Sequence, residues 1–140
     1  IENKGLSAVL ALLDEARLGV ASVAVGIAEA AIEKAAEFAK ERIAFREAHR
    51  RKAGYPSGYS QKWKPRPLQP VALMYEVASD YDAGKNINAG AAKAKWFATQ
   101  TAIDVTNKAV QICGGYGLWT TFGVERFYRD AKSLRRHRRH

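Results

Sequence analysis

The stretch Ala109-Val-Gln-Ile-Cys-Gly-Gly-Tyr-Gly-Leu-Trp-Thr-Thr-Phe-Gly-Val-Glu-Arg-Phe-Tyr-Arg-Asp-Ala-Lys132 decides the fold. A helical run ends at Gly114 and Gly115, and after a short loop a second helical run begins at Val124. Glycine takes backbone conformations closed to other residues and lets the chain come close to a ligand or another chain. Glycine is also the ordinary residue after a helix C-terminus. The pattern therefore fits two structures, a plain helix cap or a turn that presents backbone groups and the Gln111 side chain to a cofactor.

Helical periodicity extends over most of the remaining chain. The spacing of apolar residues predicts helices over residues 6–45, 71–81, 89–112 and 124–134, and no strand. The first of these is rich in alanine, which favours helix and close approach of helices. A helix of that length spans about 60 Å, which is long for an isolated domain and indicates a bundle with partners. The predicted fold class is an all-α helical bundle.

Two of the predicted helices carry further detail. For the helix over 89–112, the predicted buried stripe consists of Ala92, Trp96, Ile103 and Val110, with Phe97 and Ala109 beside it. The helix over 124–134 has an acidic residue near its start and a basic residue near its end, which suits the helix dipole.

Residues 46–70 break the helical pattern. They hold all four prolines of the chain and have no apolar period. We expect this segment to be irregular or disordered, and residues 82–86 to form a turn. The domain organisation predicted from these patterns is a single domain over 1–140, with the second helix of the bundle disrupted and a basic tail over 133–140.

Composition bounds the class of protein. The 140 residues are 47% hydrophobic and 26% charged, which is typical of one globular domain with a real core. No apolar run is long enough to span a bilayer, and no signal-peptide pattern is present, so a membrane partner is not expected. The single cysteine excludes an internal disulfide. The expected location is cytoplasmic, or the mitochondrial matrix in a eukaryote.

The net charge of +9 suggests an anionic partner, but its distribution argues against one. The excess lies in residues 49–66 and 135–140, and the periodic segments between them are nearly balanced. Blocks of like charge are often solvated, so nucleic acid is a disfavoured partner.

Several charged or reactive side chains are candidates for function, each beside a simpler structural role. Arg17 falls on or near the apolar face of the first helix, where it requires a ligand or an ion pair with Asp14 or Glu15. Arg42 is either a bidentate phosphate donor or a solvated charge at a helix end. Cys113 has no nearby histidine or second cysteine, which favours a buried and inert thiol.

No metal site is expected. His137 and His140 are spaced for a shared metal in a helix, but no carboxylate or cysteine joins them. The sequence shows no nucleophile–base arrangement, Walker loop or zinc pattern.

Taken in order, five motifs resemble the C-terminal helical domain of the FAD-dependent acyl-CoA dehydrogenases. That family runs L-D-x-x-R-[IL]-G-[IV]-A, then F-A-x-E-R-x-x-F, A-K-x-F-A, A-V-Q-I-x-G-G-Y-G and V-E-R-F-Y-R-D-A-K. The matching segments here are residues 13–21, 38–45, 94–98, 109–117 and 124–132. The last two are long and specific, so chance is a poor explanation.

The resemblance implies a four-helix bundle that packs against its own copy in a homodimer or homotetramer, within a flavoprotein oxidoreductase of fatty-acid metabolism. It implies an FAD site in which Arg42, with Phe45 beside it, contacts the pyrophosphate of the FAD of a neighbouring subunit. The adenosine end of FAD is then contacted by Gln111, Ile112, Cys113, Gly114 and Gly115. It implies an acyl-CoA site lined by Asp14, Glu15, Ala16 and Arg17. The implied reaction is α,β-dehydrogenation of an acyl-CoA thioester, with electrons passing to an electron-transfer flavoprotein.

The departures from the family pattern concern the chemistry. The family's catalytic Glu follows R-D-A-K in a Y-E-G-T segment, and here residues 133–140 hold no carboxylate. Other members place the base at the position of Ala16, and Glu15 lies about 100° around the helix from it. The catalytic base is therefore unknown. The family's N-terminal helical and middle β domains have no counterpart in these residues, so we expect the chain to be inactive alone.

Residues 46–70 and 133–140 also depart abruptly from the family, and Leu118-Trp-Thr-Thr121 replaces its usual Y-T-K-D. One hypothesis is a shifted reading frame in a GC-rich gene, restored near Met74, which sequencing of the source DNA tests. Two other functions remain open, a non-catalytic helical oligomerisation scaffold and a basic nucleic-acid-binding module. Flavin absorbance separates the enzyme from the scaffold, and steep salt dependence of nucleic-acid binding identifies the module.

Overall fold

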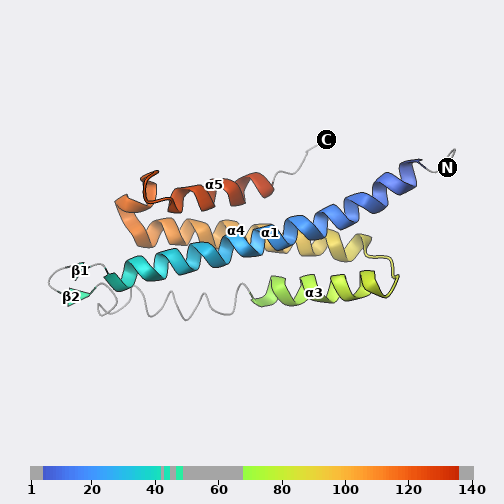
Figure 1. Ribbon diagram of the computed structural model, residues 1–140, viewed down its shortest axis with the longest axis horizontal. Helices are drawn as coiled ribbons and strands as arrows, with labels where there is room; N and C mark the ends of the chain where they lie inside the picture. The colour runs from blue at the N-terminus through green and yellow to red at the C-terminus, as the bar shows by residue number, and fades with distance from the viewer. Residues whose placement is uncertain (1–4, 42, 45–46, 49–67, 136–140) are drawn as a thin grey trace.

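The computed structural model describes residues 5–41, 43–44, 47–48 and 68–135. Figure 1 shows an elongated bundle of helices. The elements are α1 (Gly5–Glu41), β1 (Ile43–Ala44), β2 (Glu47–Ala48), α3 (Leu68–Asp82), α4 (Asn88–Cys113), the 3-10 turn η2 (Gly114–Leu118) and α5 (Val124–Leu134). The predicted all-α helical bundle is confirmed.

Helices α1 and α4 form the centre of the bundle and share its most extensive interface. They run in the same direction, whereas α3 and α5 run the opposite way (Figure 1). Helix α3 packs along the N-terminal part of α4 and α5 along its C-terminal part, so each covers only part of the long central pair.

Alanines hold the central pair together. On both helices they recur three, four or seven residues apart and are almost completely buried, at positions 21, 24, 28, 31, 35 and 39 of α1 and 91, 94, 98, 102 and 109 of α4. A methyl side chain lets two helix backbones approach closely. Larger apolar residues such as Val77, Ile87 and Val105 fill the core around this alanine seam.

The first helix is shorter than predicted, because α1 ends at Glu41 and not at residue 45. Ile43 and Ala44 are extended and pair antiparallel with Glu47 and Ala48. A β-branched residue such as Ile43 favours extended backbone, which periodicity alone does not register. Apart from these two-residue segments, the described residues form no strand, in agreement with the prediction.

The disrupted segment ends earlier than predicted, because α3 begins at Leu68 and not at residue 71. Pro70 lies in the first turn of α3 and is fully buried. The first N–H groups of a helix have no acceptor within it, so a proline there breaks no hydrogen bond. The rest of the expected irregular segment, beyond residues 47–48, lies outside the described residues.

The buried stripe of α4 was predicted in the wrong register. Ala92 is exposed and Trp96 is 54% exposed, whereas Ala91, Ala94 and Ala98 face α1. Periodicity counted the large indole as core, but a helix seam built from alanine has no room for it. Ile103 and Ala109 are buried as predicted. Helix α5 has its predicted bounds.

Candidate functional site

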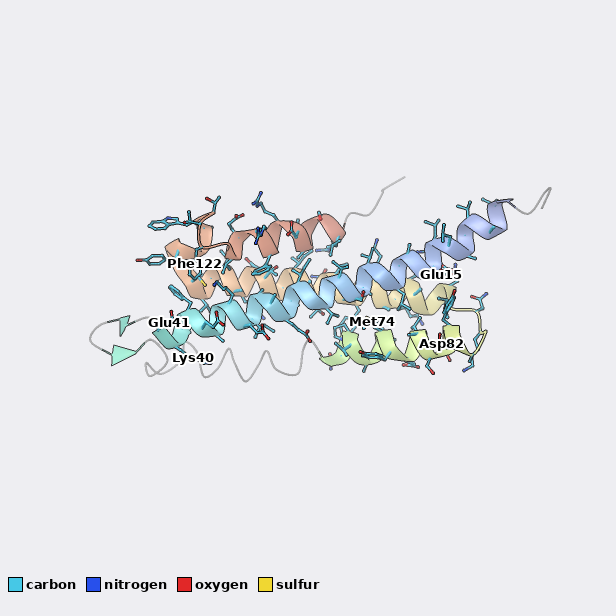
Figure 2. All side chains as sticks on the ribbon, in the orientation of Figure 1. Glu15, Lys40, Glu41, Met74, Asp82 and Phe122 are labelled. Carbon is cyan, nitrogen blue, oxygen red and sulfur yellow. The ribbon has the colours of Figure 1, made fainter. Side chains whose placement is uncertain are left out.

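The sequence candidates gather at opposite ends of the molecule. Figure 2 shows Glu15 and Asp82 at one end, and Glu41 and Phe122 at the other. Asp14–Arg17 lies at the first end, beside the start of α4. Gln111–Gly115 lies at the second, where α4 ends.

Asp14 is the centre of a polar cluster at the first end. It is the one charged residue among those described that is buried, at 9% exposure. A buried carboxylate requires partners. Arg17 Nη1 donates to Asp14 Oδ1 over 2.7 Å, and Asn88 Nδ2 donates to Oδ1 and Oδ2 over 3.2 and 3.1 Å. The structure therefore gives Arg17 the ion pair that the sequence offered as one alternative.

The Glu15 side chain points towards α3, and it does not occupy the place of an acidic side chain on Ala16. Tyr81 donates its hydroxyl hydrogen to Glu15 Oε1 over 2.7 Å. This hydrogen bond and the negative charge of Glu15 raise the pKa of Tyr81 above its usual value. Ala16 is exposed and carries no acid. The geometry thus gives no reason to place a catalytic base on Glu15.

A groove of about 480 Å³ runs beside this cluster. Its walls include Leu10 and Asp14 from α1 and Lys85 and Asn86 from the turn before α4. Tyr81 and Ile87 also line a second, more apolar groove of about 360 Å³ between α1 and α3. Polar and apolar surfaces therefore meet at the substrate candidates.

At the other end, the three glycines of the turn have different roles. Gly114 has φ +57°, a conformation that L side chains rarely adopt. A Cβ on Gly117 would lie 2.6 Å from the Val110 carbonyl oxygen, so only glycine lets η2 fold onto the end of α4. A Cβ on Gly115 would meet no atom within 4 Å, so its backbone borders open space.

The remaining residues of the turn divide into exposed and buried ones. Gln111 is exposed, whereas Ile112 is 7% and Cys113 0% exposed. The burial expected for Cys113 is confirmed. Ile112 and Cys113 pack with Ala35 and Val124 in the core, so their side chains anchor the turn to the bundle.

An aromatic cluster covers the same end and was not identified from the sequence. Tyr116 lies 5.7 Å from Phe38 and 5.2 Å from Trp119 between ring centroids, and Lys34 Nζ lies 5.6 Å from the Phe122 ring centre. Trp119 is 60% exposed. The residues of this aromatic cluster come from α1 and from the connection between α4 and α5. These segments are far apart in the sequence, so residue spacing does not predict their contact.

Some candidates cannot be placed. Arg42, Phe45, His137 and His140 lie outside the described residues. Within the described part of the chain, no group of histidine, cysteine and acidic side chains is arranged to hold a metal. No helix described here has the length and apolar character needed to cross a bilayer.

The parallel central pair, with α3 and α5 packed against α4, defines a four-helix bundle domain. The family model for the acyl-CoA dehydrogenase C-terminal domain matches residues 3–56 and 69–136, and the chain belongs to this family. The family is FAD-dependent. The match leaves out residues 57–68. It includes residues 46–56, which belong to the segment that departs from the five family motifs.

Particular relatives support the assignment. The short-chain-specific acyl-CoA dehydrogenase of Megasphaera elsdenii is 39% identical over 138 residues, covering 94% of this chain and 34% of the relative. The caffeyl-CoA reductase–Etf complex subunit CarC of Acetobacterium woodii is 38% identical over 132 residues, covering 93% and 34%. The solved butyryl-CoA dehydrogenase of M. elsdenii superimposes with a TM-score of 0.90 at 38% identity, covering 96% of this chain and 35% of that one. The chain therefore spans about a third of the length of these relatives.

Proposed function

We propose that this chain forms the C-terminal helical domain of an FAD-dependent enzyme that dehydrogenates an acyl-CoA thioester between its α and β carbons. The observation that carries the proposal is the family match, together with a fold that places the two motif segments at opposite ends of α4. The other domains of the relatives have no counterpart in these residues, so the activity belongs to an assembly larger than this bundle.

The substrate segment is Asp14–Arg17. Arg17 uses one donor on Asp14, and its side chain is 37% exposed, so other guanidinium donors are accessible to solvent. An arginine oriented in this way offers fixed donors to the carbonyl and phosphate oxygens of an acyl-CoA. Ala16, on the same turn of α1, is also exposed.

The cofactor segment is Gln111–Gly115, with Arg42 and Phe45 as further FAD residues. The open space over Gly115 and the exposed Gln111 amide fit a ligand that lies against the backbone. Ile112 and Cys113 contribute to FAD binding through their main chain, because their side chains are buried. FAD, when bound, accepts the β-hydrogen of the substrate as hydride. The residues of this turn bind and orient it.

The distance between the two segments supports a homodimer or homotetramer. Asn88 contacts the substrate segment and Gln111 begins the cofactor segment, and the helix between them spans about 35 Å, roughly the diameter of a small domain. One chain therefore cannot bring both segments to one active centre. In a symmetric oligomer each copy supplies one segment to each of two centres.

The direction of electron flow has two candidates. CarC is named as a reductase within an Etf complex and is as similar to this chain as the solved butyryl-CoA dehydrogenase. An electron-transfer flavoprotein as partner fits either direction, since it exchanges electrons with the flavin. Reduction of an α,β-unsaturated acyl-CoA is the second candidate function.

The test uses the complete open reading frame that contains these residues. We expect the purified product to show flavin absorbance, and expect butyryl-CoA to bleach it without added reductant. A flavin that bleaches only with reduced electron-transfer flavoprotein and is then reoxidised by an enoyl-CoA supports the reductase. A colourless product that binds neither FAD nor acyl-CoA overturns the proposal and supports the oligomerisation scaffold.

A further inference from the structure

Asp14 is held from outside its own helix. Its two carboxylate oxygens are 3.1 and 3.2 Å from the same atom, Asn88 Nδ2, which belongs to the first residue of α4. A single amide nitrogen in contact with both oxygens holds the carboxylate against the start of α4. The residues are 74 positions apart in the chain, so this contact exists only in the folded bundle.

Asn88 is itself fixed by the turn that precedes it. Asn86 Oδ1 accepts a hydrogen bond from the backbone N–H of Asn88 over 3.0 Å. The turn also contains Gly84 at φ +72° and the buried Ile87, which anchors it to the core. The Asn88 amide therefore extends from a defined backbone position.

The orientation of Arg17 depends on this arrangement. Its Nη1 donates to Asp14 Oδ1 over 2.7 Å, and Oδ1 also accepts from Asn88. An arginine on a helix surface that is 37% exposed samples several rotamers unless a partner holds it. A carboxylate that Asn88 holds in one position restricts that choice, and a carboxylate free to change rotamer does not.

We propose that Asn88 is a positioning residue, which orients Arg17 through Asp14 for recognition of an acyl-CoA. The inference rests on the proposed function for its ligand, and on the three hydrogen bonds to Asp14 for its geometry. The Asn88 side chain acts through Asp14 and Arg17, which makes α4 part of the substrate site.

The first experiment measures the order of Arg17 directly in this chain. Nitrogen-15 NMR of arginine side chains should show a slowly exchanging Arg17 guanidinium in the wild-type protein. Asn88→Ala and Asp14→Asn should each speed up that exchange severalfold. Asn107→Ala is the matched control, because it makes the same change at an exposed position of the same helix. An Arg17 signal that Asn88→Ala leaves unchanged overturns the proposal.

The second experiment measures, by calorimetry, the affinity for butyryl-CoA of the product of the complete open reading frame that contains these residues. Asn88→Ala should weaken binding about tenfold, as expected for a hydrogen bond to a charged group. In an Asp14→Asn background it should have no further effect, because both changes break one chain of contacts. Additive losses would contradict the proposal.

The two arms distinguish this inference from the proposed function. An Arg17 that is ordered by Asn88, in a complete product that does not bind butyryl-CoA, leaves the positioning geometry standing and removes its ligand. Binding of butyryl-CoA that is insensitive to Asn88→Ala supports the substrate site and overturns the role of Asn88.

Discussion

At the residue scale, neighbouring glycines of one motif are required for different physical reasons. Gly114 is required by its positive φ and Gly117 by the close approach of the Val110 carbonyl. Gly115 has neither constraint, and its backbone borders open space. The fold therefore explains two of the three, and the third is where a ligand would explain the absence of a side chain.

Gly117→Ala and Gly115→Ala form a matched pair. We expect Gly117→Ala to lower the free energy of unfolding by about 1–3 kcal/mol, because the new methyl group meets backbone that cannot yield easily. We expect Gly115→Ala to change it by less than about 0.5 kcal/mol. Urea denaturation measures both.

The same pair tests the cofactor segment. Gly115→Ala should weaken FAD binding, measured by flavin fluorescence, while the protein remains as stable as the wild type. An unchanged FAD affinity in this variant would show that the ligand does not lie over Gly115.

The Tyr81–Glu15 hydrogen bond predicts a dependence on alkaline pH. It raises the pKa of Tyr81 above its ordinary value of 10.0. The folded state therefore favours the neutral phenol, and this contribution to stability is fully present below about pH 10 and disappears as the pH rises through the folded pKa.

Ultraviolet absorbance of tyrosinate in the folded protein measures this titration. Tyr81 should ionise above the ordinary pKa of tyrosine, and Tyr81→Phe should remove that step. Glu15→Gln should move it back towards the ordinary pKa. If Tyr81→Phe leaves the late step in place, the assignment is wrong.

At the element scale, the α1–α4 pair depends on small side chains. Each buried alanine removes little apolar surface from water, so stability comes from close contact of two long helices along many turns. This seam also fixes the rotation of α4, and thereby places Asn88 against Asp14 and Gln111 at the surface.

Ala98→Leu should separate the central helices. Ala98 is 1% exposed, and three additional carbons there should lower the free energy of unfolding by about 1–3 kcal/mol. Ala92→Leu, at an exposed position of the same helix, should change it by less than about 0.5 kcal/mol. Thermal unfolding followed by circular dichroism compares the two, and equal losses would contradict the observed rotation of α4.

At the scale of the whole molecule, the bundle leaves apolar surface uncovered. Helix α5 extends along only part of α1, and the first turns of α1 expose Leu6, Leu12 and Leu13 by 76%, 65% and 47%. Several large apolar side chains exposed on one segment of a helix favour an interaction site there. This surface and the separation of the two candidate segments both favour an assembly of several copies.

Self-association makes stability depend on concentration. If the chain forms a homodimer or homotetramer, its Tm should rise with protein concentration, because association stabilises the folded state by mass action. Sedimentation velocity should show a species larger than 15.5 kDa over the same range. A monomer at every concentration would contradict the oligomer proposal.

The sequence by itself determined the class of fold, the α5 helix, the glycine turn and the family, because these follow from local periodicity and from long contiguous motifs. It placed the end of α1 and the start of α3 three to four residues away from their observed positions. It also placed the buried stripe of α4 in the wrong register. Periodicity records which residues are apolar, but it does not record how close the neighbouring helix lies.

Only the tertiary structure decided which candidates act together. Packing placed Asn88 on Asp14, Tyr81 on Glu15 and Trp119 beside Tyr116, and buried Ile112 and Cys113 beneath the turn. The Asn88–Asp14 and Tyr81–Glu15 contacts join residues that are distant in the chain, unlike the pair of Trp119 and Tyr116. The burial of Ile112 and Cys113 depends on which face of α4 the neighbouring helices cover. Hydrogen bonds act over about 3 Å in space, so the order of residues cannot specify them until the helices have packed.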